Sequence, residues 1–206
     1  GFDLAHHNLG NAFRALGKLD EAVECYRRAI KNNDKLFIAH NNLGVSLQEL
    51  GNLDEAIVYQ RQTVTVAPGF SEGYYNLHAL LLDTTNMVPS IECLERAVEI
   101  QPSNVKYRFT LGLLWDYFGD TERAETHFSF IENGLSEDKW WLDAWYYLKA
   151  NNEKFPPIVG TSIETFKLGL EAAIARGLVL EFGVRFGTSI RQIAGLVDEE
   201  IHGFDS

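Results

Sequence analysis

The feature that most constrains the fold is an internal period of 34 residues. Glycine, leucine and alanine recur at this spacing with no gap between copies, in four columns that keep one phase. Such agreement is very improbable by chance, so we infer a repeated structural unit. The columns are Gly10, Gly44, His78 and Gly112; Gly17, Gly51, Thr85 and Gly119; Ala22, Ala56, Ser90 and Ala124; and Leu9, Leu43, Leu77 and Leu111.

Each column predicts one feature of a helix pair. The leucine column is expected on the first helix, facing the core. The first glycine column and the alanine column would let two helices approach closely. The second glycine column predicts the end of the first helix, where a left-handed cap is favoured. Asp20 and Asp54 follow near the start of the second helix, where a carboxylate complements free N–H groups. Pro68 and Pro102 predict the ends of second helices.

The pattern resembles the tetratricopeptide-repeat (TPR) family. The resemblance rests on Gly-Lys-Leu-Asp-Glu-Ala at 17–22 and Cys-Tyr-Arg-Arg-Ala-Ile at 25–30. It implies a mainly α fold, an α-α superhelix of four helix-turn-helix repeats over 3–136, divided at 3–36, 37–70, 71–104 and 105–136. It also implies a scaffold that binds protein or peptide. Because repeats bury their apolar faces only against neighbours, we expect residues 137–154 to form a capping helix and linker.

A row of amides is predicted on the inner surface, which the first helices of a TPR array line. It comprises Asn8, Asn42 and Asn76, with Thr110 in the fourth repeat. Asparagine is a mediocre residue inside a helix, and its amide offers both donors and an acceptor. The row resembles the asparagine ladder of O-linked N-acetylglucosamine transferases, which implies a grip on an extended peptide backbone. The alternative is that these amides cap local backbone or face water.

The positions beside the amide row grade from polar to aromatic. They are His7, Asn41, Tyr75 and Phe109. We predict that His7, Asn41 and Tyr75 join the amide row in contacting a peptide. An apolar end of that peptide would lie near Tyr75 and Phe109.

The last fifty residues change character. Residues 178–182 predict a short buried strand, followed by a glycine turn, a helix at 189–196 and a second strand ending at Asp205. This order is typical of half a nucleotide-binding α/β unit. The spacing Glu-x-Gly-x-x-x-Gly resembles motif I of class I S-adenosylmethionine-dependent methyltransferases, of the TylF-like macrocin O-methyltransferase group. The resemblance implies that Glu181, Gly183 and Gly187 border the methionine part of the cofactor and Asp205 holds the ribose. The alternative is an ordinary βαβ turn without a ligand.

We expect the segment 155–206 to be an incomplete, Rossmann-like methyltransferase fragment, since that fold has about seven strands and only two are predicted here. The fragment is then expected to be inactive and to bind no S-adenosylmethionine. A longer parent would be a methyltransferase acting on a sugar or a peptide. Unpaired strand edges would also allow a homodimer through the truncated sheet. Scaffold, enzyme and self-associating protein thus remain three open classes.

Composition excludes several partners and sites. The net charge is −11 and no Lys/Arg cluster is present, which argues against nucleic acid and membrane surfaces. Cys25 and Cys93 form no CxxC motif, so we expect a cytoplasmic protein without a disulfide framework. His6 and His7 are adjacent and point different ways on a helix, and no His-x₃-His pair appears, so no metal site is expected.

Overall fold

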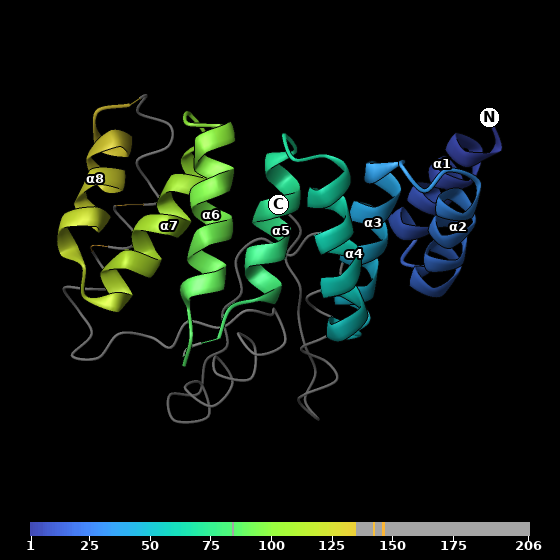
Figure 1. The fold of residues 1–206 in the computed structure, drawn as a ribbon, viewed down its shortest axis with the longest axis horizontal. Helices are drawn as coiled ribbons and strands as arrows, with labels where there is room; N and C mark the ends of the chain where they lie inside the picture. Colours follow the sequence, from blue (N-terminus) through green and yellow to red (C-terminus); the bar gives the residue numbers. More distant parts are fainter. Residues whose placement is uncertain (84, 135–141, 143–145, 147–206) are drawn as a thin grey trace, which may run out of the picture.

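The computed structural model describes residues 1–83, 85–134, 142 and 146. This part of the chain forms eight α-helices and contains no strand, as a TPR-like superhelix requires. Consecutive helices stand side by side in one row from the N-terminal end onward (Figure 1). The helices are α1 (Phe2–Ala15), α2 (Leu19–Asn32), α3 (Phe37–Glu49), α4 (Leu53–Val66), α5 (Ser71–Leu80), α6 (Val88–Ile100), α7 (Val105–Phe118) and α8 (Thr121–Glu132).

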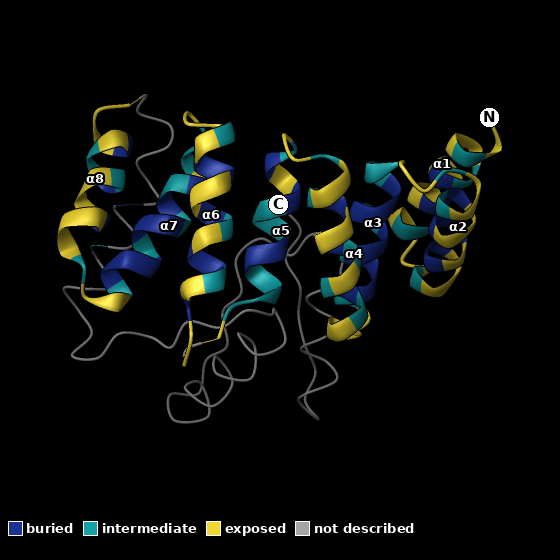
Figure 2. Ribbon diagram, in the orientation of Figure 1, coloured by how far each residue is buried: buried dark blue, intermediate teal, exposed yellow. Residues whose placement is uncertain are grey.

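The helices pack in sequence order. α1 packs on α2, α3 on α4, α5 on α6 and α7 on α8, and each second helix also packs on the first helix of the next pair. The first helices α1, α3 and α5 contact one another in turn. α3 and α7 are mostly buried, whereas α6 and α8 carry broad exposed faces (Figure 2). Within the described ranges, no helix is long and apolar enough to cross a membrane.

The first glycine column marks the closest approach within a helix pair, as predicted. A β-carbon on Gly10 would lie 2.6 Å from Cε1 of Tyr26, and one on Gly112 would lie 2.6 Å from Cε1 of Phe128. At Gly44 the neighbour is Gln60, whose Nε2 would lie 2.8 Å away. Contacts this short require a neighbour to shift, and the buried rings of Tyr26 and Phe128 leave little room for that, so glycine favours this helix packing.

His78 occupies the glycine slot of the third pair, and two nearby residues accommodate it. The slot of Tyr26 and Phe128 holds Leu94 there, and the alanine column holds Ser90. The Ser90 hydroxyl donates to the His78 carbonyl oxygen at 3.1 Å and lies 3.3 Å from Nδ1 of the ring. Burial lowers the pKa of His78 to about 3, so this imidazole is neutral.

The second glycine column ends the first helices with left-handed backbone, as predicted. Gly17, Gly51 and Gly119 have φ angles of 71°, 83° and 87°. The third pair differs because Thr85, a β-branched residue, disfavours that conformation. There α5 ends at Leu80, and the Asp83 carboxylate accepts hydrogen bonds from the Thr85 amide and hydroxyl at 2.8 and 2.7 Å. An Asp-centred turn thus replaces the glycine cap.

The expectation that the whole leucine column faces the core is wrong at its first member. Leu43, Leu77 and Leu111 are buried, but Leu9 is 47% exposed. The side chains of α3, α5 and α7 are covered by the second helix of the preceding pair, and no preceding pair lies on α1 in the described structure. The position of a residue within a repeat therefore predicts its burial only where a preceding helix pair covers it.

The residues predicted to end and begin the second helices do so without side-chain capping hydrogen bonds. α4 and α6 end two residues before Pro68 and Pro102. Asp20 and Asp54 lie in the first turns of α2 and α4, but neither helix has a side-chain cap hydrogen bond. Their contribution is therefore the favourable interaction of a carboxylate with the positive end of the helix dipole.

Two residues of the predicted capping segment lie against the last helix pair. Leu142 is buried in the core cluster formed by α6, α7 and α8. The Tyr146 ring packs edge-on to Phe128, and its hydroxyl donates to Oε1 of Glu132 at 3.0 Å. The rest of the predicted capping segment, 137–154, lies outside the described residues, so the cap as a whole stays a prediction.

Candidate peptide-binding surface

The predicted amide row lies on the first helices. Asn8 is on α1, Asn42 on α3 and Asn76 on α5, and these three helices contact one another in turn. We call the area carrying these side chains and their polar neighbours the first-helix surface. Asn8 is exposed, whereas Asn42 and Asn76 are half-buried.

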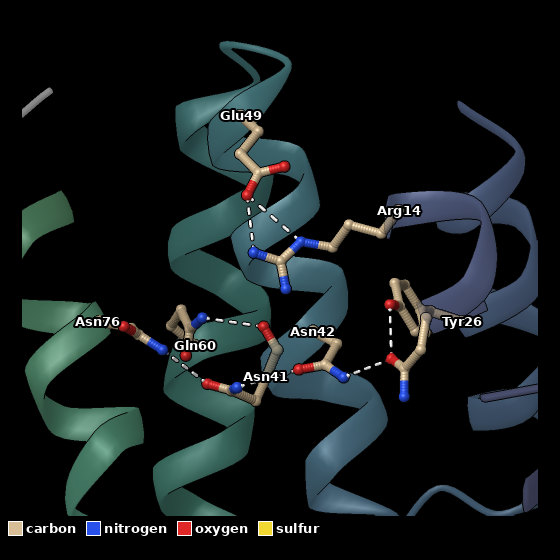
Figure 3. Close-up of polar contacts among 8 residues, drawn as sticks. Arg14, Tyr26, Asn41, Asn42, Glu49, Gln60 and Asn76 are labelled. Atoms are coloured by element: carbon tan, nitrogen blue, oxygen red, sulfur yellow. Dashed lines mark hydrogen bonds and ion pairs between the residues drawn. The ribbon is translucent and has the colours of Figure 1, made fainter. Parts of the chain in front are cut away.

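The amides bond to one another rather than to local backbone. Asn76 donates through Nδ2 to Oδ1 of Asn41 at 2.9 Å, and Asn41 donates to Oδ1 of Asn42 at 3.3 Å. Asn42 in turn donates to Oδ1 of Asn11 at 2.9 Å. Figure 3 shows this chain running from α5 across α3 toward α1. We call these residues, with Tyr26 and His7, the amide chain; it joins three successive helix pairs.

The N-terminal end of the amide chain is fixed by two further groups. Oδ1 of Asn11 also accepts from the Tyr26 hydroxyl at 2.8 Å, and burial raises the pKa of Tyr26 to about 12, which keeps this donor protonated. Nε2 of His7 lies 3.1 Å from Nδ2 of Asn42, and Nδ1 lies 3.3 Å from Oδ1 of Asn8. The ring therefore carries its proton on Nδ1 and accepts from Asn42 at Nε2.

The three asparagines of the amide row differ in how many of their donors and acceptors are already used. Asn42 uses both N–H directions, to His7 and Asn11, and its oxygen accepts from Asn41. Asn76 gives one N–H to Asn41, and its Oδ1 accepts no hydrogen bond from the described residues. The Asn8 oxygen faces His7, and its NH₂ group donates to none of the described residues. Open hydrogen-bonding capacity is therefore at Asn8 and Asn76.

Several predicted contact residues are buried. His7 is 7% exposed, Asn41 is 5% exposed and Phe109 is 7% exposed, so His7 and Asn41 are buried members of the amide chain. Thr110 donates its hydroxyl to the Lys106 carbonyl of its own helix at 2.8 Å. The amide chain therefore ends at Asn76 and does not continue into the fourth pair.

Tyr75 lies at an aromatic end of the first-helix surface. Its half-buried ring stacks on Tyr107, with 4.9 Å between centroids, and contacts the His78 ring edge-on at 4.8 Å. The Lys106 ammonium lies 4.2 Å from the Tyr75 centroid. Among the described residues Lys106 has no carboxylate partner, so this end combines an aromatic face with a cation.

Two features of the site were not predicted from the sequence. Arg14 on α1 forms a bridge to Glu49 on α3, with Nη2 2.7 Å and Nε 3.3 Å from Oε1 (Figure 3). Gln60 on α4 is fully buried and donates to the Asn41 backbone carbonyl at 3.1 Å. Gln60 fills the slot that Tyr26, Leu94 and Phe128 fill elsewhere, so a polar residue among large apolar equivalents was the available signal.

The predicted cofactor residues Glu181, Gly183, Gly187 and Asp205 lie outside the described residues. The same holds for the proposed sheet edge in 155–206. Among the residues that are described, no group of three His, Cys, Asp or Glu side chains could hold a metal ion.

Comparison of the sequence with protein-family models supports the predicted repeats. The model described as "TPR repeat" matches residues 10–51, and that described as "Tetratricopeptide repeat" matches residues 40–67. The prediction of TPR repeats is therefore confirmed, and neither model extends into 155–206. A search of curated proteins found no significant match.

The similar solved structures are helical repeat proteins. One is MamA 41-end from Desulfovibrio magneticus RS-1, at 23% identity and a TM-score of 0.54, over 69% of this chain and 76% of that one. Another is a thermophilic TPR protein of Thermus thermophilus, at 20% identity and a TM-score of 0.55, over 94% and 98%. A third is the first TPR of Spaghetti (RPAP3) bound to the HSP90 peptide SRMEEVD, at 19% and 0.54, over 57% and 93%. At these identities they show the fold alone.

Proposed function

We propose that this chain is a scaffold that holds an extended segment of another protein on its first-helix surface, with Asn8 and Asn76 bonding the main chain of that segment. The observation that supports this is the open capacity of both amides beside an otherwise satisfied amide chain. A similar fold in RPAP3 has been solved with a bound peptide, so the architecture can serve this purpose.

The proposal differs from a uniform ladder. The amide of Asn42 is used in hydrogen bonds to three neighbours. Asn42 therefore joins the first and second helix pairs and does not bind the ligand. A rigid row preorganises the outer amides, which lowers the entropy cost of binding. Main-chain recognition by amides would tolerate many side-chain sequences, while Tyr75 and Lys106 would favour an apolar or acidic residue at one end.

The test is selection of peptides from a displayed random library on the full chain, followed by calorimetric titration of the selected peptide. Asn8→Ala and Asn76→Ala should each weaken binding by roughly three- to tenfold, the effect of one hydrogen bond of about 0.5–1.5 kcal/mol. Asn32→Ala is the matched control, because Asn32 is an exposed amide at the end of α2. Peptide affinity that is unchanged in both Asn8→Ala and Asn76→Ala would contradict the proposal.

A second proposal concerns the sequence motif in 155–206. We infer from Glu181, Gly183, Gly187 and Asp205 that a longer parent would bind S-adenosylmethionine and methylate a sugar or peptide recruited by the repeats. The support is the spacing of glycines and acid alone. Calorimetric titration of S-adenosylmethionine into this chain and into Asp205→Ala tests it. Binding lost in the variant supports a cofactor site, and absence of binding leaves the scaffold proposal alone.

The compartment remains a prediction. Cys25 and Cys93 are both free thiols in the structure, which fits a reducing environment. We therefore keep the cytoplasm as the proposed location.

A further inference from the structure

One end of the amide chain meets a buried ring, that of His7. Nε2 of His7 accepts from Nδ2 of Asn42, and this fixes which edge of Asn42 faces α1. With Asn42 fixed, its oxygen must face Asn41, and Asn41 must turn its own oxygen toward Asn76. The direction of three amides therefore follows from the lone pair at Nε2.

We propose that protonation of His7 reverses the amide chain and changes what Asn76 presents on the first-helix surface. A protonated imidazole donates from both nitrogens, so Nε2–H would then face the NH₂ group of Asn42. Rotation of the Asn42 amide by half a turn restores that hydrogen bond, but it places two donors face to face between Asn42 and Asn41. Asn41, and then Asn76, must rotate in turn.

The same reversal can be accommodated at the other end. After the rotation, Oδ1 of Asn42 faces Oδ1 of Asn11, so Asn11 also rotates and donates in both directions. The Tyr26 hydroxyl, which now donates to Asn11 at 2.8 Å, can turn its proton away and accept instead. The reversal therefore satisfies the amides of Asn11, Asn41, Asn42 and Asn76, at the cost of the hydrogen bond that the buried Tyr26 hydroxyl now donates.

Among the described residues, none of the groups that face His7 from the neighbouring helices carries an unpaired charge, so the proposed reversal depends on the charge of His7 itself. From α2, Tyr26 faces it at 5.9 Å between ring centroids and stays protonated. From α3, neutral Asn42 faces it, and Glu49 lies two turns along, paired with Arg14. On α1 itself, Asp3 lies one turn earlier, and its carboxylate accepts from Asn33.

The consequence concerns the proposed function, on which this part of the inference rests. With neutral His7, Asn76 offers an open oxygen and one open N–H. After reversal its oxygen accepts from Asn41 and both N–H groups are open. Protonation of His7 would therefore turn the Asn76 position from one that can accept a peptide N–H into one that only donates.

The experiment needs no ligand, so it is independent of whether the scaffold proposal holds. Nuclear magnetic resonance of the full chain would follow the ring nitrogens of His7 and the side-chain NH₂ groups of Asn76 and Asn32 across pH. The expected result is an Nδ1–H tautomer at neutral pH and an Asn76 signal that moves with the midpoint of His7, while Asn32 stays still. In His7→Gln the Asn76 signal should not move.

Three results would overturn the inference: an Nε2–H tautomer at neutral pH, an Asn76 signal that ignores the titration of His7, or a ring that stays neutral until the chain unfolds. A movement of Asn76 that persists unchanged in His7→Gln would also overturn it. If His7→Gln does not fold, the titration of the unaltered chain decides between these outcomes by itself.

Discussion

Asn76 on α5 donates to the side-chain oxygen of Asn41 on α3, 2.9 Å away across the boundary between two helix pairs. This bond joins an amide predicted to contact a ligand to one that is buried. The bond links the second and third helix pairs, and the proposed ligand contacts fall to Asn8 and Asn76 at the two ends of the row.

Asn42→Ala should destabilise the fold, because it removes three hydrogen bonds and leaves partly buried partners on α1 and α3 without their mate. We expect a loss of about 1–2 kcal/mol in the free energy of unfolding, measured by urea denaturation. Asn8→Ala is the control within the same row and should change stability by less than about 0.5 kcal/mol. Equal losses in the two variants would contradict the separate roles given to them.

Gly112→Ala should destabilise the fourth helix pair. The added β-carbon would lie 2.6 Å from Cε1 of buried Phe128, and such overpacking costs about 1–3 kcal/mol. Gly69→Ala is the control, since a β-carbon there meets nothing within 4 Å. Urea denaturation measures both. A smaller residue in Gly112→Ala/Phe128→Leu should recover part of the loss, and a neutral Gly112→Ala would refute the close approach.

Stability should fall with acidification because of His78. Burial lowers the pKa of the folded-state ring to about 3, whereas histidine in an unfolded chain titrates near pH 6.5. Below that pH the unfolded state binds the proton first, so stability is lost progressively as pH falls. We expect a loss of about 2 kcal/mol between roughly pH 6.5 and 4.5 from this group.

Denaturation at several pH values measures that slope, with His78→Gln as the comparison. The variant should lose a large part of the slope, and the remainder should include His127, whose pKa burial lowers to about 4. A slope that is the same in His78→Gln would show that the ring does not stay neutral in the folded chain.

Cys93 should react slowly with thiol reagents. Burial raises its pKa to about 11, and burial also raises the pKa of Cys25. Because the thiolate is the reactive form, both should be labelled far more slowly at pH 8 than in urea, as followed by release of a chromogenic thiol. Rapid labelling of the folded chain would place the second helices differently from the structure.

The sequence predicted those features that backbone packing alone decides. Gly10 and Gly112 marked the close approaches and Gly17, Gly51 and Gly119 the left-handed helix ends, because in each case only glycine satisfies the geometry. The early end of α5 was less predictable, since the turn after it is held by a side-chain bond from Asp83 to Thr85 that no repeat column contains.

The site was only half predictable. The phase of the repeat placed Asn8, Asn42 and Asn76 on one surface. It could not show that Asn42 spends its hydrogen bonds on His7, Asn11 and Asn41, because those contacts depend on how closely α1 and α3 approach.

The measurement that tests the account most directly is a thermodynamic cycle between Asn76 and the ligand backbone. Each amide of a peptide selected on the chain would be N-methylated in turn, and its affinity measured for the unaltered protein and for Asn76→Ala. We expect one position where methylation weakens binding about tenfold in the unaltered protein and has no effect in Asn76→Ala. Equal effects in both proteins at every position would contradict it.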